Sequence, residues 1–437
     1  MALDNIVLSD NAQYILSKRA LDHTELAVIR ELTELVKKSP LINLPSDKLE
    51  YLAKQIIKPT HLSYSELAVK YIAFGIDRGI RGYAHKERKD IDFNGERKPA
   101  ATHPYKVAKM LATFSARYVS LISGFLHDFI EEQADKKPLG ISFDLWSNQL
   151  IKDFSQQYDQ FGNNLFNSLK QNPPEGVRYL YPDAEFSAAK PIICNVILRM
   201  THNNENGTYF DYLSRLLGIG DSSRRNKKLK RKNLIIQEKE RQSKKQWELT
   251  KFEAIARSST IKLVDMIDTI DDYTESVLVG RNNFPPGQIA FAIFKILTYW
   301  NYATHKIKFM SEENRRSYLY TRLQDVTQLL QEIAVYDFGR IINYYDEQKL
   351  LTTEQQKSIK HEVLEYMNTP ESSRFSTTNQ HDKYGGLVLN QYLPAFTGRK
   401  ELVTKRKDEE CYRDIFLFRE YLLKSKTLYP LFGLRTK

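Results

Sequence analysis

The decapeptide "SGFLHDFIEE", Ser123 to Glu132, places four ionisable side chains in a segment that is otherwise apolar. His127 and Asp128 are adjacent, and two glutamates follow them. We expect the whole segment to be helical, so that Glu131 lies one turn from both His127 and Asp128. A buried carboxylate needs a partner or is driven to its neutral form. One divalent metal ion would satisfy all four groups, although a lone His–Asp pair on a helix is more often a hydrogen-bonded surface pair.

The chain around this segment predicts helices and little else. Apolar residues recur at steps of three and four over 63–80, 104–114, 115–132, 188–200, 209–219, 252–279, 322–345 and 352–368. The first of these segments opens with Ser63 and Glu66 in capping-box spacing. Strand-like alternation is scarce. We therefore expect an all-α fold.

At 437 residues the chain is long for one compact domain. Apolar residues make up 41% of it, which is enough to build a core. The sequence predicts an N-terminal helical extension, a main helical domain with a basic insert, a further helical region, and a linker with a basic, aromatic tail. Their predicted boundaries are 1–60, 61–300 with the insert at about 222–251, 301–368 and 369–437.

The net charge of +11 is concentrated in the insert. Residues 224–251 contain twelve Lys or Arg and three Glu, so the rest of the chain is nearly neutral. Two cysteines, Cys194 and Cys411, exclude a disulfide framework and a cysteine-based zinc site. The N-terminus has no secretory pattern, and no apolar segment is long enough to span a bilayer. We expect a cytoplasmic protein without membrane contact.

Further potential metal ligands lie on both sides of the His–Asp pair. His103 precedes Pro104 and should lie in the first turn of a helix, while Asp265 and Asp268 share one face of a distant helix at i, i+3 spacing. A mixed imidazole and carboxylate set suits manganese, iron, cobalt or zinc better than calcium. Such a set leaves coordination positions for water and a phosphoryl oxygen, which is the arrangement for metal-assisted hydrolysis.

His103, the His127–Asp128 pair and Asp265, in this order, resemble the H…HD…D signature of the HD phosphohydrolase superfamily. Four stretches are similar to motifs of the RelA/SpoT-type alarmone hydrolases: "PAATHPYKVA", "LHDFIEE", "THNNENGTYFDYLSR" and "IKLVDMIDTID". The resemblance covers about residues 61–290, and no match to the family's synthetase domain is found in 300–437. It implies an HD-domain helical bundle with N- and C-terminal helical extensions, as in the stand-alone hydrolases.

The resemblance also implies the chemistry. The metal, usually manganese, would be held by His103, His127, Asp128 and Asp265, and Glu131 and Glu132 would position or activate the attacking water. The implied reaction removes pyrophosphate from the 3′ position of guanosine tetra- or pentaphosphate. The positions that would contact the substrate are Lys89, Arg97, Lys98, Tyr209, Tyr212, Arg215, Asp268 and Thr269.

The chain departs from the family at positions close to these. Glu132 stands where the family has Asp, Ala100 replaces a Tyr, and Thr269 replaces an Asn. Because the metal set is intact while specificity positions differ, two alternatives stay open. One is an HD hydrolase of another phosphorylated nucleotide, such as an adenosine alarmone or a dinucleotide phosphate. The other is a non-catalytic nucleotide- or RNA-binding regulator. The basic insert could be a solvated helical hairpin, could cover a polyphosphate, or could bind RNA or the ribosome. The oligomeric state is not predicted.

Overall fold

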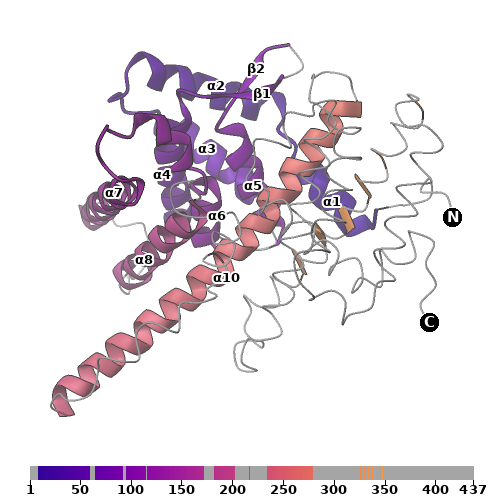
Figure 1. Ribbon diagram of the computed structural model, residues 1–437. Coiled ribbons are helices and arrows are strands. Elements are labelled where there is room, and N and C mark those ends of the chain that lie inside the picture. Colours follow the sequence, from indigo (N-terminus) through magenta and orange to yellow (C-terminus); the bar gives the residue numbers. More distant parts are fainter. Residues whose placement is uncertain are drawn as a thin grey trace, which may run out of the picture. The chain divides into compact units, whose positions relative to one another are not determined.

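The structure is a computed structural model that describes residues 8–59, 64–91, 95–114, 116–171, 182–201, 216, 234–278 and scattered residues between 325 and 347. Most of these residues are helical, so the predicted all-α class is confirmed. The helices (Figure 1) are α1 (Asp10–Arg19), α2 (His23–Lys38), α3 (Ser46–Ile57), α4 (Glu66–Tyr83), α5 (Thr102–Thr113), α6 (Tyr118–Phe125), the 3-10 helix η2 (Glu131–Lys136), α7 (Phe143–Gln171), α8 (Pro182–Met200) and α10 (Leu234–Leu278). Within the described part of the chain, no helix combines the length and the apolar character needed to cross a membrane.

Contacts divide the chain into two units. The first comprises Ile15–Arg88 and Glu96–Lys262, and the second comprises Met1–Tyr14, Lys89–Gly95 and Leu263–Lys437. Helix α10 is continuous across the boundary at Lys262. It begins well before the predicted 252–279 helix, so residues 234–251, more than half of the predicted basic insert, are helical backbone.

The core of the first unit forms around α4. Ser65 caps this helix by accepting a hydrogen bond from the amide of Ala68, so the cap lies two residues after the predicted Ser63. Most residues of α4 are buried, and the helix packs against α2, α3 and α6. Glycines allow α6 to come close: a Cβ on Gly79 would overlap the ring of Phe125. The close approach of α4 to α6 therefore depends on the absence of a side chain.

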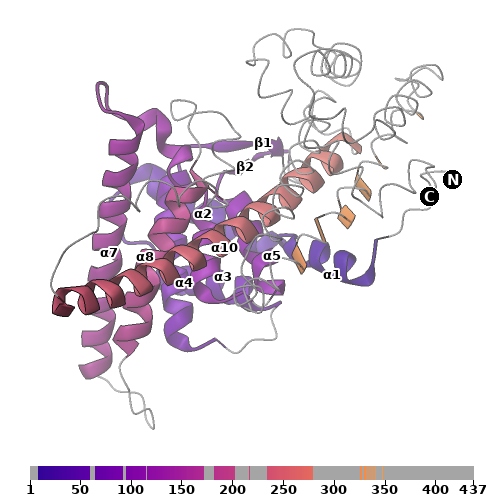
Figure 2. The ribbon, with the colours of Figure 1, turned by 60° about the horizontal axis from the view of Figure 1, so that its bottom comes forward.

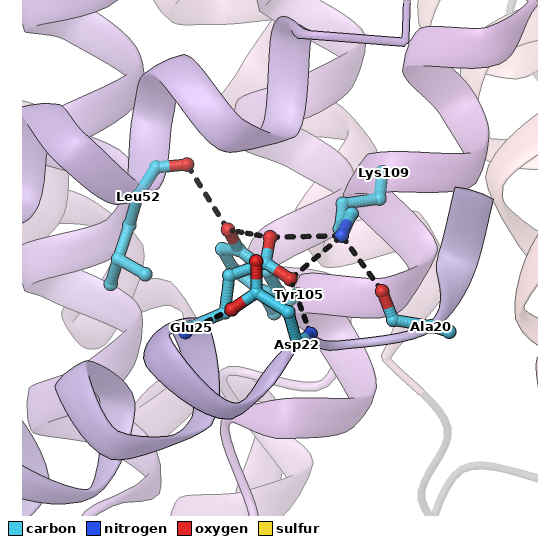
Figure 3. A network of polar contacts seen from close by, with 6 residues as sticks. All are labelled: Ala20, Asp22, Glu25, Leu52, Tyr105 and Lys109. Carbon is cyan, nitrogen blue, oxygen red and sulfur yellow. Dashed lines mark hydrogen bonds and ion pairs between the residues drawn. The ribbon is translucent and has the colours of Figure 1, made fainter.

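A buried polar network joins α2 to α5 (Figure 3). The Lys109 ammonium donates to both oxygens of Glu25, at 2.8 and 2.9 Å, and to the Ala20 carbonyl at 2.9 Å. The Tyr105 hydroxyl donates to Glu25 Oε1 at 2.9 Å. Glu25 also closes the capping box of α2 with Asp22. The network fixes α5, the helix that carries His103, against the start of α2.

The chain also forms a two-stranded sheet that the sequence pattern did not predict. Strands β1 (Glu87–Ile91) and β2 (Arg97–Pro99) are hydrogen-bonded to each other, and β2 lies beside α2 (Figure 2). The strands are too short to show an alternating pattern in the sequence. The sheet directs the chain from the end of α4 to the start of α5.

The described residues of the second unit make their own polar contacts. The Ser9 hydroxyl donates to Glu332 at 2.9 Å, and Arg340 binds Glu275 of α10 at 2.7 Å and Asp337 at 3.2 Å. The tail 369–437, most of the region 301–368 and residues 217–233 lie outside the described residues. The predicted domain boundaries therefore stay predictions.

Candidate metal centre

Helix α5 presents His103 in its first turn, as the sequence predicted. The helix begins at Thr102, and the His103 side chain is 5% exposed. Proline at the next position is compatible with this turn because its missing N–H would have no intrahelical partner there. The amide of His103 donates to the Ala100 carbonyl at 3.4 Å. Ala100 belongs to the segment that links β2 to α5, so this bond fixes the start of the helix.

The segment containing His127 and Asp128 is a turn and not part of a helix. Helix α6 ends at Phe125, and residues 126–130 form turns before η2 begins at Glu131. The prediction of an unbroken helix through Glu132 is therefore wrong. His127 itself competes with the helical pattern, because its Nδ1 lies 2.7 Å from the carbonyl oxygen of Gly124. That oxygen is the acceptor that the Asp128 amide would use in a continuing helix.

The turn brings His127 and Asp128 together with His103. Asp128 Oδ2 lies 3.2 Å from His127 Nε2 and 3.8 Å from His103 Nε2. The two imidazole rings meet edge to face with centroids 5.2 Å apart. His127 is fully buried, whereas the Asp128 side chain is 25% exposed. Three predicted ligands from α5 and the turn after α6 thus share one location.

Asp265 is the fourth predicted ligand and lies on α10, one turn beyond Lys262. It is 6% exposed. One ligand atom from each of His103, His127 and Asp265 lies within 4.8 Å of the others, a group that can hold a metal ion. Such a His/Asp cluster is what the sequence predicted, and the identity of the ion stays a prediction.

The donor chemistry of this cluster fits a cation. A carbonyl oxygen can only accept, so the bond to Gly124 places the proton of a neutral His127 on Nδ1. Nε2 then directs a lone pair toward the carboxylate oxygen of Asp128 at 3.2 Å. Two acceptors at this distance repel each other unless a proton or a metal ion lies with them. A divalent ion removes the repulsion and neutralises the buried carboxylates.

Glu131 and Glu132 begin η2 directly after the turn and are both half-buried. Glu132 is engaged by a lysine, because Lys86 Nζ lies 3.3 Å from its Oε2. A second lysine is close to the first: partial burial lowers the pKa of Lys136, and the charge of Lys86 lowers it further. The edge of the cluster near Glu132 therefore carries two cationic side chains.

The residues predicted to contact a substrate divide into three groups. Lys89 lies on β1, and Arg97 and Lys98 lie on β2, where Arg97 is exposed. On α10, Asp268 is fully buried and Thr269 is half-buried. The remaining three, Tyr209, Tyr212 and Arg215, lie outside the described residues.

Sequence reasoning missed two residues at this site, Tyr83 and Lys86. Tyr83 is the last residue of α4, and Lys86 lies three residues after it, just before β1. The Tyr83 hydroxyl donates to the carbonyl of Phe125, the last residue of α6, at 2.8 Å. The available signal was weak, because a tyrosine on the apolar face of a helix reads as ordinary packing.

Comparison with known proteins gives no significant match: no protein-family model, no curated protein and no solved structure matches the chain. The function proposed below is therefore inferred from the side chains of the cluster and from the resemblance of its sequence motifs.

Proposed function

We propose that this protein is a divalent-metal-dependent phosphohydrolase of the HD superfamily, and that it removes pyrophosphate from the 3′ position of guanosine tetra- or pentaphosphate. The observation that carries the proposal is the convergence of His103, His127 and Asp265 within 4.8 Å, with Asp128 beside both histidines. These four residues are the ones that the resembling motifs assign to the metal.

Four residues are the proposed metal ligands. His103, His127, Asp128 and Asp265 hold the ion, for which manganese is the proposed identity. When bound, such an ion polarises a phosphoryl oxygen and makes a coordinated water more acidic. The Gly124 carbonyl keeps His127 in the tautomer that offers Nε2 to the ion. Four ligands leave room for water and substrate in the coordination sphere of such a metal.

The two glutamates take different roles in this proposal. Glu132 is already bound to Lys86, so it holds that ammonium group at the edge of the cluster. Glu131 is the carboxylate we assign to accept the proton of the attacking water. Lys86 and Lys136 then lie where the phosphates of an anionic substrate approach, and their charges stabilise the negative charge that builds up during phosphoryl transfer.

The specificity positions direct the choice of substrates for a test. Ala100 is 8% exposed, and its amide donates to the Lys86 carbonyl at 3.2 Å. Its backbone therefore holds the chain near the cluster, and its side chain is only a methyl group. The family that the motifs resemble has a tyrosine at this position, so the base it would contact can differ here. Adenosine analogues and phosphorylated dinucleotides should therefore be tested as substrates together with the guanosine compounds.

The test is a hydrolysis screen of these nucleotides with the full chain and added Mn²⁺. Asp128→Asn removes one ligand charge with little change of shape, and Asp159→Asn is the matched control, because Asp159 is an exposed partner of Lys190 on α7 and α8. Pyrophosphate release from guanosine tetraphosphate, lost in Asp128→Asn and kept in the control, supports the proposal. Turnover of another nucleotide alone keeps the mechanism and changes the substrate. No Mn²⁺-dependent turnover, together with salt-sensitive RNA binding that survives Asp128→Asn, contradicts it in favour of a binding protein.

A further inference from the structure

The end of α4 contacts both parts of the candidate metal centre. Tyr83 is the last residue of this helix, and its side chain is 1% exposed. Its ring lies edge-on against Phe125, with centroids 6.2 Å apart. A tyrosine hydroxyl buried this deeply requires a hydrogen-bond partner, and Tyr83 finds one at the last residue of α6.

This partner is the Phe125 carbonyl, which accepts from the Tyr83 hydroxyl at 2.8 Å. In a continuing helix this carbonyl would accept from the amide of Phe129. That amide donates instead to the Leu126 carbonyl at 3.1 Å. The hydroxyl of Tyr83 therefore takes the place of one helical hydrogen bond.

The carbonyl next to it, that of Gly124, is also contacted by a side chain. In a continuing helix the amide of Asp128 would bond the Gly124 carbonyl, which Nδ1 of His127 contacts here at 2.7 Å. Two adjacent carbonyls at the end of α6 therefore contact the side chains of Tyr83 and His127 in place of the amides of the next turn. Burial raises the pKa of Tyr83 well above its ordinary value, and the charges of Asp128 and Glu132 add to the shift, so the hydroxyl keeps its proton as a donor.

The backbone of the same segment leads to His103. The amide of Lys86 donates to the Tyr83 carbonyl at 3.0 Å, and the amide of Ala100 donates to the Lys86 carbonyl at 3.2 Å. The Ala100 carbonyl in turn accepts from the amide of His103 at 3.4 Å. Tyr83 therefore connects two parts of the site. Its hydroxyl bonds the end of α6, before the turn that carries His127 and Asp128, and its carbonyl begins the series of backbone bonds that reaches His103.

We propose that Tyr83 is a positioning residue for the metal centre: its hydroxyl holds the turn after α6 in the conformation that presents His127 and Asp128 as a pair of ligands. This inference rests on the proposed function, because it requires that the cluster bind a divalent ion. Without the hydroxyl, the Phe125 carbonyl loses the donor that replaces the helical amide, and the turn can relax toward the helical pattern. Partners of this kind, one step behind the ligands, change metal affinity by about 10- to 100-fold.

The test compares Tyr83→Phe with Tyr64→Phe in the full chain. Tyr64 is half-buried, and its hydroxyl likewise donates to a backbone carbonyl, that of Ala116, so the control removes an equivalent group elsewhere. Binding of Mn²⁺ is measured from the electron paramagnetic resonance signal of the free ion, and folding from the thermal transition. We expect Tyr83→Phe to weaken Mn²⁺ binding by about 10-fold or more. Tyr64→Phe should lower the unfolding temperature without changing the affinity.

The outcomes separate this inference from the proposed function. If the wild type binds no Mn²⁺, the proposed function fails. If the wild type binds and Tyr83→Phe binds equally well, or if Tyr64→Phe weakens binding as much, the positioning role is overturned. Should Tyr83→Phe not fold, hydrogen exchange of the wild type, resolved to the Phe129 amide, replaces it. The inference requires that this amide, which donates to the Leu126 carbonyl in the held turn, exchange far more slowly than exposed turn amides, and fast exchange would refute it.

Discussion

Replacing Lys109 by methionine should destabilise the first unit strongly, because it leaves the Glu25 charge buried without its cation. Lys109 Nζ makes three hydrogen bonds, two to Glu25 and one to the Ala20 carbonyl. The side chains of Lys109 and Glu25 are only 9% and 2% exposed. Breaking a buried ion pair by removing one partner costs about 3–5 kcal/mol. In a unit of this size that corresponds to a fall in melting temperature of roughly 6–20 °C.

The assay is urea unfolding followed by circular dichroism, with two comparison variants. In Lys109→Met with Glu25→Gln both charges are gone, and glutamine can still close the capping box of α2, so most of the lost stability should return. Lys37→Met removes an exposed partner of Glu34 and should cost less than about 1 kcal/mol. The reasoning would be refuted if Lys109→Met lowered the free energy of unfolding as little as Lys37→Met does. It would also be refuted if the double variant were no more stable than Lys109→Met.

Three further predictions concern the site and its surroundings. Lys86→Met should raise KM for the phosphorylated substrate several-fold and leave the affinity for Mn²⁺ unchanged, because the ion pair of Lys86 is with Glu132, which is not a proposed ligand. A loss of Mn²⁺ binding in a titration would contradict this role of Lys86. Gly79→Ala should cost about 1–3 kcal/mol in urea unfolding, because the new methyl group overlaps the Phe125 ring, and an unchanged midpoint would show that α6 moves freely. Burial raises the pKa of Cys194 to about 11, so in a Cys411→Ser background its thiol should react slowly with Ellman's reagent at pH 8 and faster as the pH approaches 11; fast reaction at pH 8 would contradict that environment.

Local patterns predicted several helices of the first unit, although α7 (Phe143–Gln171), the longest helix wholly within it, was not among the predicted segments. The all-α class followed from apolar residues at steps of three and four, and the start of α5 followed from Pro104 after His103. The cap of α4 was misplaced by two residues: Ser65 bonds the Ala68 amide, and the predicted Ser63 lies outside the described residues. Sequence spacing alone does not distinguish two nearby serines.

The turn at His127 was not predictable from periodicity. Its residues continue the apolar pattern of α6, and the helix ends where two side chains, His127 of the segment itself and Tyr83 of α4, take the place of backbone amides at its last carbonyls. Tyr83 belongs to α4, and its contact with Phe125 joins residues 42 positions apart in the chain. The metal ligands themselves were accessible from the motif, whereas the groups that orient them depend on tertiary packing. The same holds for Lys86, whose partner Glu132 lies on another element.

The central claim is that His103, His127, Asp128 and Asp265 hold one divalent ion. The most direct measurement is an anomalous diffraction map from crystals of the full chain grown with Mn²⁺, recorded on both sides of the manganese absorption edge. The account predicts one strong peak within coordination distance of Nε2 of His127 and of the carboxylates of Asp128 and Asp265. A map with no peak at this position under saturating Mn²⁺, or with the ion bound only elsewhere, would contradict it.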